Sequence, residues 1–169
     1  FHTRRVREYF TAEWFADLLN KHTSSRRQIE ALFFREQYDL KIIPPVLRPI
    51  LPWLIIQDKK IADRVFEIAP ELVFEGGVPS KLQLEDRCRI LKQVCKQIAE
   101  ESLSQSATDY AAIQRFATPD LTECVRELLK LYINNDDLTF LLFRMVWIGQ
   151  MKNARSEVLE AAMSSTAEQ

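Results

Sequence analysis

Cysteine and histidine, the residues that most often carry nucleophilic or metal chemistry, are few in this chain and widely spaced. The 169 residues include three cysteines, Cys88, Cys95 and Cys124, and two histidines, His2 and His22. Cys88 and Cys95 share one predicted helix, where seven residues separate them by about 10 Å, too far for a disulfide or for one shared metal ion. All three cysteines are therefore predicted to be small buried apolar residues.

No cofactor or metal site is expected. Metal ligation needs His, Cys or carboxylate side chains at close, fixed spacing, and neither histidine has such neighbours. The Gly76-Gly77 pair lacks the lysine and the helix start of a phosphate-binding loop. A Ser/His/Asp or Cys/His site can assemble through space, but the two histidines lie near the N-terminus and the chain has only three glycines. An enzyme is thus the least favoured class.

Two arginines lie in strongly apolar segments and are predicted to form buried ion pairs. Arg144 lies inside the apolar run 138–151, and Arg48 lies among prolines and aliphatic residues. A buried charge without a partner is very costly, so structural pairing is expected for both, with docking to another protein as the alternative role. Trp53 and Trp147 are predicted core residues, although an exposed tryptophan would indicate an interface.

The basic clusters are short and mixed with acidic residues. They are Arg4-Arg5-Arg7, Arg26-Arg27 and Lys59-Lys60. Solvated helix faces explain such clusters, and a phosphate-contacting edge on the first of them is the alternative. The net charge of −1 creates no overall field that favours nucleic acid or an acidic membrane.

The apolar period is helical over nearly the whole chain, which predicts an all-α fold. In the first helix, Val6, Phe10, Trp14 and Leu18 recur every four residues. With the flanking Tyr9, Ala12 and Leu19 they are predicted to form one wide apolar stripe. The composition agrees, since 47% of the residues are hydrophobic and the low glycine content disfavours turn-rich β folds.

The proline-rich segment 38–56 is the exception to the helical period. Residues 38–45 are predicted to break the preceding helix, because Pro44 and Pro45 cannot donate backbone hydrogen bonds. For residues 46–56 we favour a short helix that starts near Arg48 or Pro49, with the prolines in its first turn. A strand is the alternative that the β-branched content leaves open.

The second half predicts stacked helical hairpins. Helix starts near Pro119, Asp136 and Ala154 are evenly spaced, as in helical-repeat proteins. The helix over 138–151 is apolar on nearly every side and is expected to be sandwiched between others.

Asp58 is the predicted N-cap of a helix over 59–69, and Asn134-Asn135-Asp136 is predicted to cap the helix that follows it. The predicted fold is an all-α, HEAT-like helical hairpin array with a less regular first half. Residues 1–163 form its single domain, with a hinge candidate at 76–79 and a frayed tail at 164–169.

The opening of the chain resembles the sequence motif that follows the nucleotide-binding and winged-helix modules of NACHT-type STAND ATPases. In that family a Phe and a His lead into a Glu-(Tyr/Phe)-x-x-Ala helix. The matching positions here are Phe1, Val6, Glu8, Tyr9 and Ala12. The segment 47–54, Leu-Arg-Pro-Ile-Leu-Pro-Trp-Leu, resembles the same region in bacterial members of the family. The family's usual histidine falls one place later, where this chain has Thr3 after His2.

The resemblance implies a non-catalytic piece of a larger signalling ATPase, whose phosphate loop and Mg²⁺-binding acids would lie upstream. Such helical regions sense a trigger, hold the ATPase closed or carry oligomer contacts, and bacterial relatives act in signalling or antiphage defence. The expected partner is a protein, through a junction at Arg4, Arg5, Glu8 and Tyr9. Because the chain begins without methionine, it is expected to be an excised piece.

Two rival functions remain open: a free-standing helical adaptor that binds a protein in a groove between helices, and, less favoured, a nucleic-acid contact through Arg4-Arg5-Arg7. A cytoplasmic location is expected, because an odd cysteine count fits a reducing compartment. No membrane contact is expected, since the longest uncharged run of note, residues 49–57, is far shorter than the ~20 residues that span a bilayer.

Overall fold

The computed structural model describes residues 2–21, 23–100 and 110–166, and this part of the chain is mostly helical. The all-α prediction is confirmed at that level. The chain divides into two compact units, Phe1–Lys81 and Leu82–Gln169. The boundary comes shortly after the 76–79 segment.

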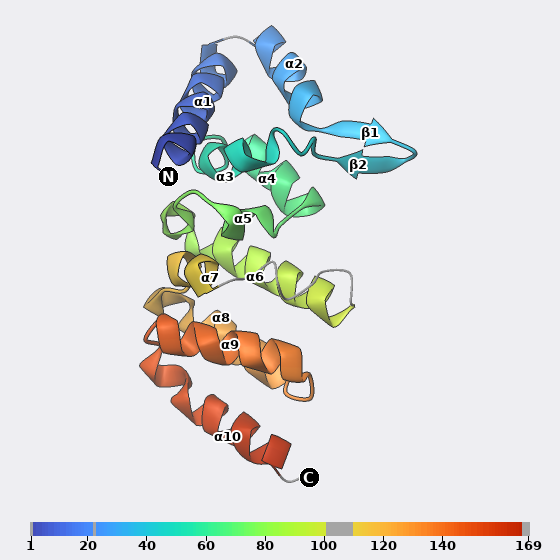
Figure 1. The fold of residues 1–169 in the computed structure, drawn as a ribbon. Helices are drawn as coiled ribbons and strands as arrows, with labels where there is room; N and C mark the ends of the chain where they lie inside the picture. The colour runs from blue at the N-terminus through green and yellow to red at the C-terminus, as the bar shows by residue number, and fades with distance from the viewer. Residues whose placement is uncertain (1, 22, 101–109, 167–169) are drawn as a thin grey trace. The chain divides into compact units, whose positions relative to one another are not determined.

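The first unit combines helices with one β-hairpin (Figure 1). Its elements are, in order, α1 (His2–Lys21), α2 (Thr23–Phe33), β1 (Arg35–Gln37), β2 (Leu40–Ile42), the 3₁₀ helix η1 (Arg48–Ile50), α3 (Leu51–Leu54), α4 (Lys59–Ile68), α5 (Leu72–Glu75) and the 3₁₀ helix η2 (Pro79–Lys81).

The buried face of α1 overlaps the predicted wide stripe only at its flank, where Ala12 and Leu19 are buried. Ala12, Phe15, Ala16 and Leu19 are buried, and α1 packs through this side of the helix against α2, η1 and α3. The predicted stripe at residues 6, 10 and 14 is exposed instead. Both stripes have helical spacing, and the alanines decide between them because small side chains let a neighbouring helix approach closely.

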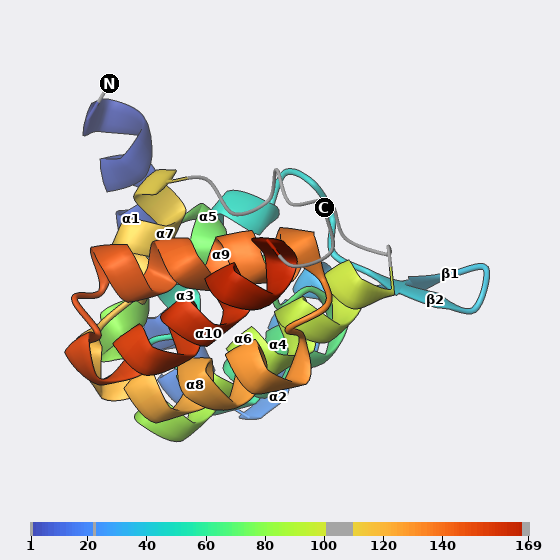
Figure 2. The ribbon, with the colours of Figure 1, turned by 90° about the horizontal axis from the view of Figure 1, so that it is seen from below.

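The segment after α2 forms a two-stranded antiparallel hairpin rather than a simple break. Tyr38 and Asp39 connect the strands with φ of 53° and 60°, so both turn residues are left-handed, as a type I′ turn requires. The hairpin extends away from the helices of its unit in Figures 1 and 2. Beyond Ile42 the strand alternative is wrong, and the preferred short helix is confirmed because Pro49 and Pro52 lie in the first turns of η1 and α3.

Asp58 is the N-cap of α4, as predicted. Its carboxylate accepts a hydrogen bond from the Ile61 backbone N–H at 3.0 Å, and the Arg26 guanidinium donates to both carboxylate oxygens at 3.2 and 2.6 Å. Burial alone would raise the pKa of Asp58, but the hydrogen bonds from Arg26 and from the backbone outweigh it and lower the pKa. The cap therefore also ties α2 to α4.

Gly77 rather than Gly76 adopts the left-handed conformation after α5, with φ of 66°, while Gly76 is extended. A Cβ atom built on Gly77 would lie 2.0 Å from the carbonyl oxygen of Pro52, whereas one built on Gly76 would lie 3.4 Å from the Pro52 side chain. Position 77 therefore requires glycine for two reasons: its backbone is left-handed, and α3 approaches too closely to leave room for a Cβ atom.

The second unit contains α6 (Leu84–Ala99), α7 (Tyr110–Phe116), the 3₁₀ helix η4 (Pro119–Leu121), α8 (Thr122–Leu131), α9 (Asp136–Ile148), the 3₁₀ helix η5 (Lys152–Ala154) and α10 (Arg155–Thr166). α8 packs against α6, α9 and α10, and α9 packs also against α7 and α10 (Figures 1 and 2). Asn135 caps α9 as predicted, because its side chain accepts a hydrogen bond from the Leu138 N–H. The backbone of 164–166 continues α10, three residues past the predicted boundary at 163, and 167–169 lie outside the described residues.

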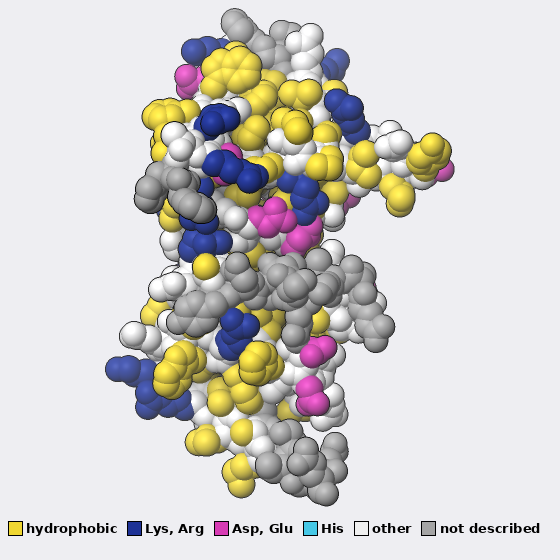
Figure 3. Space-filling model, viewed as in Figure 1, with side chains coloured by type: hydrophobic (Ala, Val, Ile, Leu, Met, Phe, Trp, Pro, Cys, Tyr) yellow, Lys and Arg dark blue, Asp and Glu magenta, His cyan; other side chains and the backbone are white. Residues whose placement is uncertain are grey.

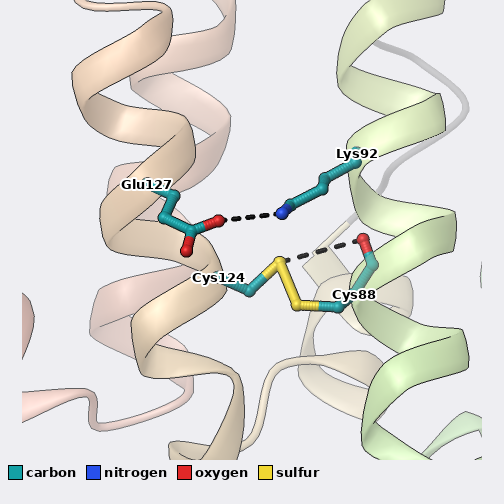
Figure 4. The surroundings of a disulfide bond; sticks show 4 residues. All are labelled: Cys88, Lys92, Cys124 and Glu127. Atoms are coloured by element: carbon teal, nitrogen blue, oxygen red, sulfur yellow. Dashed lines mark hydrogen bonds and ion pairs between the residues drawn. A yellow bond between two sulfur atoms is a disulfide. The ribbon is translucent and has the colours of Figure 1, made fainter.

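Cys88 and Cys124 are joined by a disulfide, so the prediction of three unpaired core cysteines is wrong for this pair (Figure 4). The two residues lie on α6 and α8, 36 residues apart in sequence, with Cα atoms 6.0 Å apart. Beside the disulfide, Lys92 and Glu127 form a second link between the same helices, with Nζ 2.8 Å from Oε2. Spacing along one helix cannot reveal a partner that packing brings from another helix. Cys95 remains a buried free thiol, as predicted.

Candidate functional site

The predicted junction residues lie on the N-terminal half of α1 and are not all exposed, since the Glu8 side chain is 19% exposed. Arg4 Nε is 2.9 Å from Glu8 Oε1, one helical turn away, and Arg5 is exposed. The Tyr9 ring packs edge-on against Trp53 of α3, with centroids 5.6 Å apart. Arg4 and Glu8 are thus paired with each other, while Tyr9 links α1 to α3.

An exposed apolar row runs beside these residues. Val6, Phe10 and Trp14 are 48%, 63% and 58% exposed, and we call these three residues the α1 row. Tyr9 borders the row, and its hydrogen bond with Glu13, together with the charge of Glu13, raises the pKa of the phenol. Aromatic side chains exposed at successive turns of one helix are typical of a protein-contact surface.

Arg48 lies in a network with two glutamates of the same unit. Its Nη2 is 2.9 Å from Glu71 Oε1 and 3.0 Å from Glu75 Oε1, at the start and the end of α5. Burial alone would lower the pKa of Arg48, but the hydrogen bonds to Glu75 and Glu71 outweigh it and raise the pKa. The arginine therefore connects η1 to α5.

The second predicted buried arginine, Arg144, is half-buried in the middle of α9. Its guanidinium carbon lies 5.7 Å from the centroid of the Phe140 ring. Arg48 and Arg144 belong to different units, so the two predicted residues do not form one site.

The expectation that α9 is enclosed on all sides is wrong. Its side chains Phe140 and Trp147 are 59% and 82% exposed. They line a groove of about 900 Å³ between α9 and the segment that carries η5 and α10, which we call the α9–α10 groove. Its apolar lining includes Phe140, Phe143, Trp147, Met151, Val158 and Leu159.

The charges that line this groove have one sign. Arg144, Lys152 and Arg155 line it, and the described lining residues include no aspartate or glutamate. In Figure 3, apolar side chains gather over α9 with basic side chains beside them. Sequence analysis missed this groove, because an all-round apolar helix has the same pattern whether its last face is covered or open.

The most buried arginine of the described chain also escaped the sequence analysis. Arg87 on α6 is 3% exposed, donates to Thr118 Oγ1 at 2.5 Å and forms an ion pair with Asp120. Burial would raise the pKa of Asp120, but the hydrogen bonds from Thr118 and Arg87 lower it. Thr118 precedes η4 as predicted, yet its hydroxyl serves this network and makes no capping hydrogen bond. The sequence did contain one signal for this buried ion pair, namely an arginine on the apolar side of an amphipathic helix.

The nucleophile and ligand candidates do not assemble into a reactive group in the described residues. No cluster of three or more His, Cys, Asp or Glu side chains suited to a metal occurs among them. Burial raises the pKa of the Cys95 thiol to about 12, so this thiol stays protonated near neutral pH. His22 and the side chain of His2 lie outside the described residues. None of the described helices is long and apolar enough to cross a membrane.

The fold and these surfaces define a mostly helical protein with two exposed apolar helix faces. No family model, curated protein or solved structure matches the chain.

Proposed function

We propose that this chain is a non-catalytic helical scaffold or sensor region that mediates protein contacts within a larger STAND-type signalling ATPase. The observation that carries the proposal is the α1 row, three large apolar side chains exposed on successive turns of the first helix. Apolar area of this kind is stabilised by burial against a protein surface. The resemblance of the opening residues to the NACHT-type motif implies the domain context, in which α1 follows a winged-helix module.

The proposed junction uses the α1 row together with Arg4, Arg5, Glu8 and Tyr9. The row would provide the apolar centre of the contact, and the charged residues would form its polar rim, as protein interfaces are commonly built. Because Tyr9 packs on Trp53, a partner seated on α1 would also be coupled to α3.

The proposal includes a HEAT-like arrangement for the second unit. α8 and α9 are joined by the short turn 132–135 and pack along each other as a helical hairpin does, and α10 packs on both helices. Stacked hairpins expose helix faces for partner binding, which suits a scaffold.

A cytoplasmic location belongs to the same proposal. The Cys88–Cys124 disulfide weighs against it, since such bridges persist mainly in oxidising compartments and are transient or regulatory in reducing ones. Counting free thiols after rapid acid trapping from the native cells tests the location. Three free thiols per chain support it, and one free thiol contradicts it.

The first experiment is to read the gene upstream of Phe1. The proposal expects a nucleotide-binding and a winged-helix module there, and a gene without them would leave the free-standing adaptor as the better function. The α9–α10 groove is the observation that favours that alternative.

The second experiment measures binding of the chain to the purified upstream modules. The double substitution Phe10→Ala and Trp14→Ala should weaken binding by roughly tenfold or more, as loss of exposed aromatic anchors does. Leu131→Ala, at a side chain that is equally exposed but lies on α8, is the matched control and should have no effect. ATP hydrolysis by this chain alone would overturn the proposal.

A further inference from the structure

We propose that the α9–α10 groove is the docking site for an amphipathic helix with an acidic polar side, contributed by a partner protein. This inference deepens the proposed protein-contact function and rests on it. It concerns a separate surface, on the second unit, and it adds the chemistry of the partner.

The apolar part of the groove has the length and spacing that fit a helix. Phe140 and Trp147 are seven residues apart on α9, or about 10 Å along the helix axis. Leu159, 63% exposed, faces the groove from α10. A partner helix with apolar residues at i, i+3 or i+4, and i+7 presents an apolar stripe of the same length.

The charged residues that line the groove indicate the charge of the partner. Lys152 and Arg155 are exposed at the end of the groove where η5 meets α10, and neither has a carboxylate within ion-pair distance among the described residues. Arg144, which is half-buried and lies over the Phe140 ring, also lines the groove. Because Lys152 and Arg155 are exposed and no acid occurs among the described lining residues, an acidic helix is the complementary occupant.

The same charges argue against a second copy of this chain as the occupant. Two copies joined by this face would bring together four exposed cations, Lys152 and Arg155 of each copy, and the described lining contributes no carboxylate to pair with them.

The test uses two designed peptides of about 16 residues with the same leucine stripe, one with glutamates and one with lysines at the other positions. Fluorescence anisotropy of the labelled peptides measures binding to the full chain. The glutamate peptide should bind and the lysine peptide should not. Binding of the glutamate peptide should weaken when salt rises from about 50 to about 500 mM, because screening weakens the charge contacts.

Two variants assign the binding to the groove. Lys152→Glu with Arg155→Glu should weaken the glutamate peptide by roughly tenfold or more and allow the lysine peptide to bind. Lys59→Glu with Lys60→Glu makes the same change in net charge on α4 and is the control. Trp147→Ala should weaken the glutamate peptide, whereas Leu131→Ala should not.

Three results of the peptide assay would overturn the inference. They are equal binding of both peptides, binding of the glutamate peptide that survives the charge reversal, and absence of binding by either peptide. A dimer in analytical ultracentrifugation that Trp147→Ala dissolves would assign the groove to a second copy and would also overturn it. The Phe10→Ala and Trp14→Ala variant should bind the glutamate peptide normally, so failure at the α1 junction and failure at the groove can be told apart.

Discussion

At the scale of single residues, the residue type is most constrained where two backbone segments approach closely and where a charged side chain is buried. Gly77 lies against the backbone of α3, and Arg87 reaches Asp120 from within the second unit. Each of these contacts joins segments distant in sequence. Their effect on stability therefore depends on geometry that no local pattern contains.

Gly77→Ala should lower the free energy of unfolding by about 2–4 kcal/mol. The new Cβ would lie 2.0 Å from the Pro52 carbonyl oxygen, and the left-handed backbone itself costs an L-residue about 1–2 kcal/mol. Urea unfolding followed by circular dichroism measures the change. Gly76→Ala is the matched control, because its Cβ would make ordinary contacts on an extended backbone, and it should be neutral or slightly stabilising. Equal losses in the two variants would contradict the assignment.

At the scale of elements, α10 depends on one carboxylate in its first turn. Glu157 is buried by its neighbours, with Oε1 2.6 Å from the guanidinium of Arg126 on α8 and 3.8 Å from Lys130 Nζ. The hydrogen bonds from Ser156 and Arg126 lower the pKa of Glu157 to about 2. This ion pair is the main polar contact between α10 and α8 among the described residues.

A lowered carboxyl pKa predicts the direction of the pH dependence. The pKa of Glu157 in the folded state lies below its ordinary value of 4.5, so its stabilising effect is full above about pH 4.5 and is lost as the pH falls towards about 2. Glu157→Gln should lower the melting temperature at neutral pH, and the difference from the unmodified chain should vanish near pH 2. Glu160→Gln, an exposed position on the same helix, should show no such difference. A constant offset between Glu157→Gln and the unmodified chain at every pH would contradict this mechanism.

At the scale of the whole chain, stability and interaction are distributed over two units. Each unit has its own buried residues and its own exposed apolar face, the α1 row in the first unit and the α9–α10 groove in the second. The second unit is also covalently closed by the Cys88–Cys124 disulfide.

Reduction of that disulfide should destabilise the second unit. A bridge across 36 residues restricts the unfolded chain, and its loss costs about 2–4 kcal/mol in comparable cases. Denaturant unfolding with and without a thiol reductant should differ by that amount for the unmodified chain. The Cys88→Ala and Cys124→Ala double variant should be insensitive to the reductant. Three reactive thiols in the denatured, unreduced protein would show that the bridge is absent.

Local sequence signals were enough to predict the helical class, the caps at Asp58 and Asn135, and the placement of prolines in the first turns of η1 and α3. These features depend on a few neighbouring residues, since a cap needs only a side-chain acceptor and a free backbone N–H within three positions. The periodicity also marked α1 and α9 as apolar helices, although it centred the buried stripe of α1 on residues that are exposed.

The tertiary structure alone decided which apolar faces are buried, which cysteines pair and which arginine is most enclosed. α1 carries two apolar stripes, and contact with α3 selects the one with alanines. α9 is apolar on nearly every side, yet Trp147 stays exposed. Periodicity reports the hydrophobicity of a helix face, whereas burial requires a second surface to cover it, and that surface comes from residues far away along the chain.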